Sequence, residues 1–352
     1  MDYKLKCIKC GKEFDSSYKG QLCDSCNSIL YIEYIKANKR SKLEFNGSFW
    51  DLEDMLPKAK YKHYMLGATP LIPSLNNSNL LLKLETANPT HSFKDRGSIV
   101  ELAKAQEYGY NEVVCASTGN MAYSIAYYAK LAGIRAKIFI SKNASKDKVR
   151  DIRETHDADI EHVDGDFTKA QKLAERYAKE HNVFLAGDYG YRREGQRTIG
   201  FELAFQARNI DYIFTPVGNA TLISGLIKAW LEMLDMKIIK KIPKIVGVEA
   251  SLSAPLYKAF INNEKVKYVS PKTKADAIAV GYPTFGDEVL ENLREINGSI
   301  MTVTDKEMQI EQNRFYREYG QIAELAAVAS IVAYRKLKPK GKAVAIISGG
   351  NI

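Results

Sequence analysis

The chain has 352 residues, which is enough for two domains and a large buried core. Hydrophobic residues make up 45% and charged residues 26%, a balance that excludes an intrinsically disordered protein. The net charge of +9, from 51 Lys and Arg against 42 Asp and Glu, would indicate a nucleic-acid partner if the cations clustered. The Lys-rich stretches are short and lie at predicted helix starts or near the chain end, so we expect a solvated surface and no nucleic acid.

The N-terminal sequence "MDYKLKCIKC" contains no apolar segment followed by a small-residue cleavage site. No uncharged apolar run in the chain approaches the roughly 18 residues of a membrane span. We therefore expect a cytoplasmic protein with no membrane association.

Four of the five cysteines form a compact set: Cys7, Cys10, Cys23 and Cys26. The spacing is CxxC, twelve residues, CxxC, and each CxxC pair can place two thiolates on one side of a tight turn. Two facing pairs give the tetrahedral sulfur environment that Zn²⁺ prefers, so we predict a structural zinc ribbon with no open position for catalysis. The alternative is four reduced thiols without a metal. Cys115, in the apolar "EVVCAS", is expected in a buried strand.

A Lys-rich connector at residues 28–40 looks helical, and the body of the protein begins near residue 43. From there, short apolar runs alternate with longer amphipathic ones. We expect strands at residues 79–85, 112–117, 136–141, 159–163, 182–186, 211–217, 244–250 and 343–348. Helices are expected at residues 119–133, 166–181, 221–234 and 304–320, the last with a capping box formed by Thr304 and Glu307. This alternation predicts an α/β fold whose parallel sheets are covered by helices on both faces.

Residues 88–97 read "NPTHSFKDRG" and raise an electrostatic question. A helix N-terminus carries partial positive charge, which favours Asp95 but disfavours Lys94 and Arg96 in the same turn. One explanation is that Lys94 is not a cation in the working protein, and the alternative is an ordinary surface lysine.

Ligands of parallel α/β sheets bind beyond the carboxyl ends of the strands, so the strand-to-helix turns are candidate sites. Three turns stand out: "CASTGNMAYS", "TPVGNATLISG" and "ISGGNI". None contains a dinucleotide or P-loop nucleotide motif. In residues 217–222, a glycine and small residues lead directly into a helix, which is a pattern typical of phosphate binding, although an ordinary turn has the same appearance.

The motifs "NPTHSFKDRG", "STGN", "VGNAT" and "SGGN" occur in the order seen in the fold type II pyridoxal-phosphate enzymes. The chain resembles the threonine synthase branch of that family, which typically has an NPTGSFKDR stretch and, in some members, an N-terminal zinc ribbon. Further similarity lies in "VDGDFTKA", in "REGQRTIGFE" and around Glu324. The resemblance implies two doubly wound parallel-sheet domains and pyridoxal 5'-phosphate as cofactor.

The resemblance also implies the roles of individual residues. Lys94 would form the Schiff base with pyridoxal phosphate, which answers the electrostatic question. Asn120 would contact the hydroxyl of the cofactor ring, and Ser348 would face the pyridine nitrogen. The cofactor phosphate would be held by Gly218, Asn219, Ala220 and Thr221. A serine hydroxyl cannot keep the ring nitrogen protonated as a carboxylate would, so elimination and replacement are favoured over transamination.

The chain departs from the threonine synthase pattern in the substrate region. Met121 replaces the usual threonine, Gly187–Gly190 replace an Asn-Ser-x-Asn-Pro run, His91 replaces a glycine, and Thr221-Leu222 replace Gly-Asn. Ser117, Arg192 and Asn219 are retained and would bind an acidic group of the substrate. His91 is expected to pack beside its loop, with a role as second base left open.

The leading hypothesis is a threonine synthase in which Lys94 removes the α-proton of O-phosphohomoserine, phosphate leaves from Cγ and water adds at Cβ. The nearest alternative is a sister enzyme, either an ammonia-lyase acting on threonine or serine or a β-replacement enzyme such as cysteate synthase. A third reading is a non-catalytic zinc-ribbon protein that binds nucleic acid.

The cofactor roles also lead to an expected domain organisation. We expect a ribbon and connector at residues 1–38 and a large cofactor-binding domain at 39–110 and 190–352. A small mobile domain is expected at 111–189, and we expect the enzyme to be a homodimer.

Overall fold

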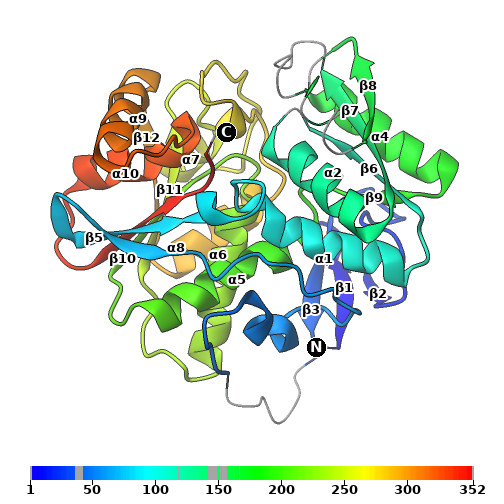
Figure 1. Ribbon diagram of the computed structural model, residues 1–352, viewed down its shortest axis with the longest axis horizontal. Coiled ribbons are helices and arrows are strands. Elements are labelled where there is room, and N and C mark those ends of the chain that lie inside the picture. Colours follow the sequence, from blue (N-terminus) through cyan, green and yellow to red (C-terminus); the bar gives the residue numbers. More distant parts are fainter. Residues whose placement is uncertain are drawn as a thin grey trace. The chain divides into compact units, whose positions relative to one another are not determined.

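The computed structural model describes residues 2–35, 43–117, 119–141, 149–150, 152, 157–165 and 167–350 (Figure 1). Their contacts divide the chain into two compact units. The first unit comprises residues 1–41, 52–65 and 94–195, and the second comprises residues 42–51, 66–93 and 196–352. These bounds group the N-terminal ribbon and the Lys94 helix with the segment expected as a small domain at 111–189. The mobility of that domain stays a prediction.

The first unit begins with a small antiparallel sheet of strand order β2-β1-β3. Its strands are β1 Tyr3–Cys7, β2 Glu13–Asp15 and β3 Leu30–Tyr34. The helical expectation for residues 28–40 is wrong over β3, because Leu30 and Ile32 alternate in burial with their neighbours and pair with β1. Residues 36–40 of that expectation lie outside the described residues.

The second sheet of this unit has the order β8-β7-β6-β9, and all its strand pairs are parallel. Its strands are β6 Glu112–Ala116, β7 Arg135–Ser141, β8 Asp159–Val163 and β9 Phe184–Leu185. Its helices are α1 Lys94–Glu107, α2 Asn120–Ala132 and α4 Phe167–His181. Val114 and Ala116 pack against small residues of α4, and by strand alternation Val113 and Cys115 point to the opposite face. Cys115 is fully buried in β6, as predicted.

The sheet of the second unit has the order β12-β11-β10-β13-β5-β4 and is parallel except for the β4–β5 pair. Its strands are β4 Leu71–Ser74, β5 Asn77–Leu84, β10 Tyr212–Pro216, β11 Lys244–Ala250, β12 Ser299–Val303 and β13 Ala343–Ile347. The remaining α-helices of the described chain are α5 Gly190–Gln206, α6 Thr221–Asp235, α7 Pro255–Ile261, α8 Gly286–Glu295, α9 Asp305–Tyr319 and α10 Leu325–Leu337. Short 3₁₀ helices occur at η1 Phe49–Met55, η2 Glu85–Ala87 and η3 Asp276–Ile278.

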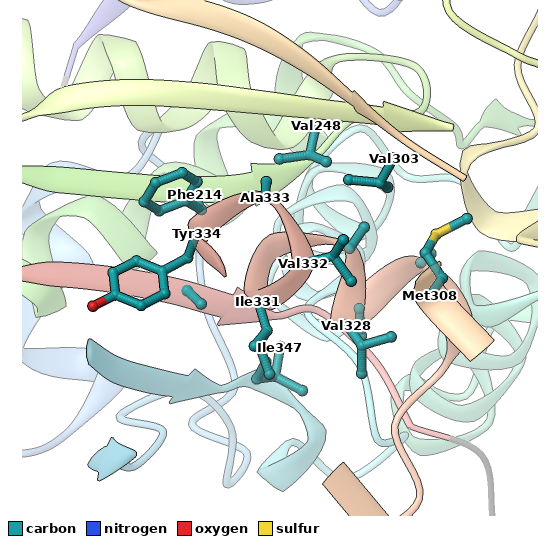
Figure 2. Packing of buried hydrophobic residues seen from close by; sticks show 14 of the residues in the cluster. Phe214, Val248, Val303, Met308, Val328, Ile331, Val332, Ala333, Tyr334 and Ile347 are labelled. Carbon is teal, nitrogen blue, oxygen red and sulfur yellow. The ribbon is translucent and has the colours of Figure 1, made fainter. Parts of the chain in front are cut away.

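Helix α10 supplies much of the hydrophobic core of the second unit. Figure 2 shows Val328, Ile331 and Val332 of this helix against residues of the sheet. Those sheet residues are Phe214, Val248, Val303 and Ile347. Because the strands that carry these side chains are buried from both sides, their apolar runs are nearly continuous, as expected of parallel strands.

The structure confirms the α/β class, the parallel sheets and all eight predicted strands. The four predicted helices are present, and the capping box is formed by Thr304 and Glu307. Among the described residues, five strands were not in the predicted set: β1, β2 and β3 of the small sheet, and β4 and β12 of the second unit. Strand β4 has four residues and contains Pro73, so its sequence does not favour a strand. Among the described residues, no helix is long and apolar enough to cross a membrane.

Candidate functional site

Lys94 is the first residue of α1, and its side chain is held inside the first unit rather than extended into solvent. The Nζ atom donates a hydrogen bond of 3.3 Å to Oδ1 of Asp188, and the two side chains are 18% and 9% exposed. Burial lowers the pKa of Lys94, and the Arg192 guanidinium lowers it further, while the Asp188 carboxylate opposes both. The amine is therefore more readily deprotonated than that of a surface lysine.

Arg192, on α5, is fully buried and bonds to the start of α1. Its guanidinium forms an ion pair with Glu101 and donates to Ser98 Oγ and to the carbonyl oxygen of Lys94, both at 3.3 Å. Its Nε donates to the carbonyl oxygen of Gly187 at 3.0 Å. In the described structure, each nitrogen of this guanidinium thus has a protein partner. Binding of substrate by Arg192 stays a prediction.

Glu101, on the second turn of α1, completes this network. It is fully buried and also accepts a hydrogen bond of 2.8 Å from the backbone N–H of Gly187. Burial raises the pKa of Glu101 to about 7, although Arg192 and the Gly187 N–H act in the opposite direction. An arginine guanidinium does not lose its proton in proteins, so Arg192 stays positively charged. This charge favours the ionised form of the Glu101 carboxylate beside it, and we expect that form.

The packing of α1 on α5 explains the glycine in "REGQ". A Cβ atom added to Gly195 would lie 1.8 Å from the carbonyl oxygen of Arg96, so the two helices approach too closely for any side chain. This close approach brings Arg192 to the first turn of α1.

Ser117 and Asn120 lie at the turn between β6 and α2, where the sequence predicted ligand contacts. Ser117 is 8% exposed, and its Oγ accepts a hydrogen bond of 3.3 Å from the N–H of Gly119. Asn120 begins α2 and is half-buried, and Met121 beside it is buried. Thr118 of the "STGN" motif lies outside the described residues.

The turn between β10 and α6 contains Gly218, Asn219, Ala220 and Thr221. Ala220 has a left-handed φ of 64°, and its methyl group offers no acceptor to the N–H groups of the first turn of α6. These amides and the helix dipole favour an anion at this end of α6.

The same turn is fixed by a neighbouring segment of the second unit. A Cβ atom on Gly218 would lie 2.7 Å from the carbonyl oxygen of Ala277, so only glycine fits this position without displacement. The N–H of Phe285 donates to the carbonyl oxygen of Asn219 at 3.2 Å. The close approach at Gly218 and the hydrogen bond at Asn219 thus restrain the turn.

Ser348 directly follows β13 and is 5% exposed. Its carbonyl oxygen accepts a hydrogen bond of 3.0 Å from the N–H of Phe93, and Ser92 forms an antiparallel bridge with Gly349. His91 is exposed, with Nδ1 3.2 Å from the carbonyl oxygen of Thr86. Asn351 of the "SGGN" motif lies outside the described residues.

The ligand atoms of Cys7, Cys10, Cys23 and Cys26 all lie within 4.8 Å of one another. The Sγ atoms of Cys7 and Cys26 are 3.4 Å apart, and those of Cys10 and Cys23 are 3.7 Å apart. Tetrahedral zinc with Zn–S bonds of about 2.3 Å requires sulfur separations in this range. The predicted set is therefore brought together.

The small sheet, whose strand β1 ends at Cys7, packs on α1 and α5. The hydroxyl groups of Tyr3 and Tyr191 are 3.0 Å apart, and those of Tyr108 and Tyr191 are 2.7 Å apart. The ammonium group of Lys104 lies 4.5 Å from the ring centroid of Tyr108. The N-terminal segment thus packs as part of the first unit. Its sequence did not predict this packing.

Sequence reasoning grouped Lys94 with Asn120, Ser348 and the 218–221 turn. Within the first unit, the structure brings Lys94 and Arg192 together, and within the second unit it joins Ser348 to the residues that precede Lys94. Asp188 and Glu101 were missed as neighbours of Lys94. Asp188 was noticed only as a departure from a family pattern, and Glu101 gave no signal because it occupies an ordinary helical position.

Comparisons with known proteins agree with the motifs. Residues 63–349 match the family described as pyridoxal-phosphate dependent enzyme. Threonine synthase of Methanosarcina acetivorans is 33% identical, covering 96% of this chain and 88% of that protein. Threonine synthase of Methanocaldococcus jannaschii is 32% identical with the same two coverages, 96% and 88%.

Solved structures share the fold. Threonine deaminase isoform 2 from Solanum lycopersicum, in its processed form, has a TM-score of 0.71 at 24% identity, covering 81% of this chain and 84% of that one. Maize serine racemase has a TM-score of 0.70 at 24% identity, covering 81% and 88%. The chain therefore belongs to the pyridoxal-phosphate-dependent enzymes of fold type II, and among them to the threonine synthase branch.

Proposed function

We propose that this chain is a threonine synthase, which converts O-phosphohomoserine and water to threonine and phosphate. The observation that carries the proposal is the similarity to threonine synthases over 96% of the chain, which leaves little of the protein without a counterpart. The activity belongs to threonine biosynthesis and to the lyases.

The described residues fit pyridoxal phosphate in three respects. Lys94 has an amine whose pKa is lowered by burial, which favours the neutral form that attacks a carbonyl group. The turn at Gly218–Thr221 offers helix N–H groups and no competing side chain at Ala220, as a phosphate requires. Ser348, which bears a hydroxyl group, directly follows the carboxyl end of β13, where ligands of such sheets bind.

In this proposal, Lys94 carries the cofactor on its amine, Asn120 contacts the ring hydroxyl and Ser348 contacts the pyridine nitrogen. Gly218, Asn219, Ala220 and Thr221 hold the phosphate. When bound, pyridoxal phosphate supplies an electron sink that stabilises negative charge at the substrate Cα.

The remaining chemistry is proton transfer and orientation by the chain's own residues. The Lys94 amine, once released, accepts the proton from Cα of the substrate as a general base. Ser117 orients the substrate through its hydroxyl group. Arg192 contributes positive charge that favours an acidic substrate group, while its hydrogen bond to the Lys94 carbonyl fixes the position of the base.

We further propose that Cys7, Cys10, Cys23 and Cys26 hold one structural zinc ion in a cytoplasmic enzyme. The spacing of the four sulfurs supports the metal site. We also propose that the enzyme is a homodimer, which light scattering of the purified protein would test.

Product analysis tests the proposed reaction. Purified enzyme is incubated separately with O-phosphohomoserine, threonine, serine and phosphoserine, and amino acids, keto acids and phosphate are quantified. A threonine synthase releases threonine and phosphate in equal amounts from O-phosphohomoserine. Keto acid and ammonia from threonine or serine, with no threonine from O-phosphohomoserine, would instead identify an ammonia-lyase.

A further inference from the structure

Asp188 places a carboxylate oxygen 3.3 Å from the Nζ atom of Lys94, within the first unit. It lies in the turn that precedes α5 and is 9% exposed at its side chain. A carboxylate so well shielded from water interacts with a cation more strongly than a surface carboxylate would.

The position of Asp188 is fixed from behind by Glu101 and Arg192. The N–H of Gly187 donates to Glu101, and the carbonyl oxygen of Gly187 accepts from Arg192, at 2.8 and 3.0 Å respectively. Arg192 bonds in turn to the carbonyl oxygen of Lys94 at 3.3 Å. The residue before Asp188 and the backbone of Lys94 are thus tied to the same buried ion pair, and this sets the separation of the two side chains.

We propose that Asp188 is a positioning residue that holds the Lys94 ammonium group in place during proton transfer. The inference rests on the proposed function, in which the released Lys94 amine is the base. When the substrate Cα–H bond breaks, its electron pair stays with Cα, the proton forms a new N–H bond, and Lys94 becomes positively charged. Asp188 stays ionised, accepts a hydrogen bond from the new ammonium group and keeps it oriented until the proton moves on.

The charges around Lys94 make this role specific. Arg192 disfavours a second positive charge on Lys94, and Asp188 offsets that effect directly at Nζ. Glu101 also favours the charged form but is paired with Arg192. Loss of the Asp188 carboxylate would remove a charge that offsets the repulsion between Arg192 and the Lys94 ammonium group.

A pH titration of the cofactor's visible absorption in the holoenzyme tests the proposal, with kcat and KM measured on the same proteins. An opposite charge at short distance raises the pKa of a nitrogen by about 1–3 units. Asp188→Asn should therefore lower the midpoint pH of the absorption change by about 1 unit or more. Because positioning acts on the proton-transfer step, kcat should fall by about 10- to 100-fold with little change in KM. Asp188→Glu, which keeps the charge, should restore most of the midpoint.

Asp159→Asn is the matched control, since Asp159 is 70% exposed and pairs with Lys137 on β7. It should leave the midpoint unchanged. An Asp188→Asn midpoint equal to that of the native enzyme overturns the proposal, as does the absence of any titration in both proteins up to about pH 10.4. If native enzyme shows no visible band, the proposed function fails instead.

If the Asp188→Asn protein does not fold, the proposal is tested by a structure of the native holoenzyme with an unreactive substrate analogue. Lys94 Nζ, released from the cofactor, should lie within about 3.2 Å of an Asp188 oxygen. A separation beyond about 4 Å excludes the ion pair and overturns the proposal.

Discussion

The backbone N–H of Phe93 donates a hydrogen bond of 3.0 Å to the carbonyl oxygen of Ser348, and the neighbouring residues Ser92 and Gly349 form an antiparallel bridge. The pairing ties the residue that precedes Lys94 to the turn near the end of the chain. It uses backbone atoms, so the Ser348 hydroxyl group is not required for it.

Substitution Ser348→Ala should therefore lower activity while leaving stability nearly unchanged. The free energy of unfolding should change by less than about 1 kcal/mol, because the Phe93 hydrogen bond remains. We expect kcat to fall by about 10- to 100-fold, since a donor or acceptor at the cofactor ring is lost. Denaturant unfolding and steady-state kinetics measure the two effects. A large loss of stability with unchanged kcat would assign Ser348 a structural role only.

Gly218→Ala should weaken cofactor binding without unfolding the protein. The new methyl group would meet the carbonyl oxygen of Ala277 at 2.7 Å, so the turn must shift. We expect the dissociation constant of pyridoxal phosphate to rise by about tenfold, which corresponds to about 1.4 kcal/mol. Equal affinity in the native and Gly218→Ala proteins would remove the turn from the cofactor site.

Glu101→Gln should be among the most destabilising single substitutions in the first unit. It leaves the buried Arg192 guanidinium without a compensating charge, for which the expected cost is about 3–5 kcal/mol. Asp159→Asn removes an exposed partner of Lys137 and should cost less than about 1 kcal/mol. Urea unfolding of both variants provides the comparison, and similar small losses in both would show that the buried pair contributes little.

Replacing Cys7 and Cys10 by serine should reduce the zinc content from about one ion per chain to none. Because Tyr3 of the same sheet contacts Tyr191 on α5, we expect a loss of about 4 kcal/mol or more in stability, while cofactor binding is retained. Metal analysis and thermal unfolding measure these effects. Cys115→Ala is the control for zinc content. Native protein free of zinc after preparation without chelators would contradict the metal assignment.

Local signals in the sequence predicted most of the fold. Strands such as residues 244–250 have near-continuous apolar runs, and the helix after Thr304 has a capping box, so each could be recognised from its own residues. The connector at 28–40 was misread because its alternation over Leu30–Tyr34 is short and becomes visible as a strand only through pairing with β1.

The candidate site was predicted only where motifs mark it. Lys94 and the 218–221 turn lie in recognisable stretches, whereas the Asp188 contact and the Glu101–Arg192 pair join positions about 90 residues apart and leave no local pattern. Membership of a family of enzymes removes the support for a non-catalytic nucleic-acid-binding protein, and the dispersed cations had already disfavoured that reading.

The central claim is that Lys94 carries pyridoxal phosphate. Reduction of the native enzyme with borohydride, followed by proteolysis and mass spectrometry, should find the pyridoxyl label on Lys94. The Lys94→Ala protein should fold, lack the visible absorption band and show no turnover. A label on another lysine, or a Lys94→Ala protein that keeps both its band and its activity, would contradict the account.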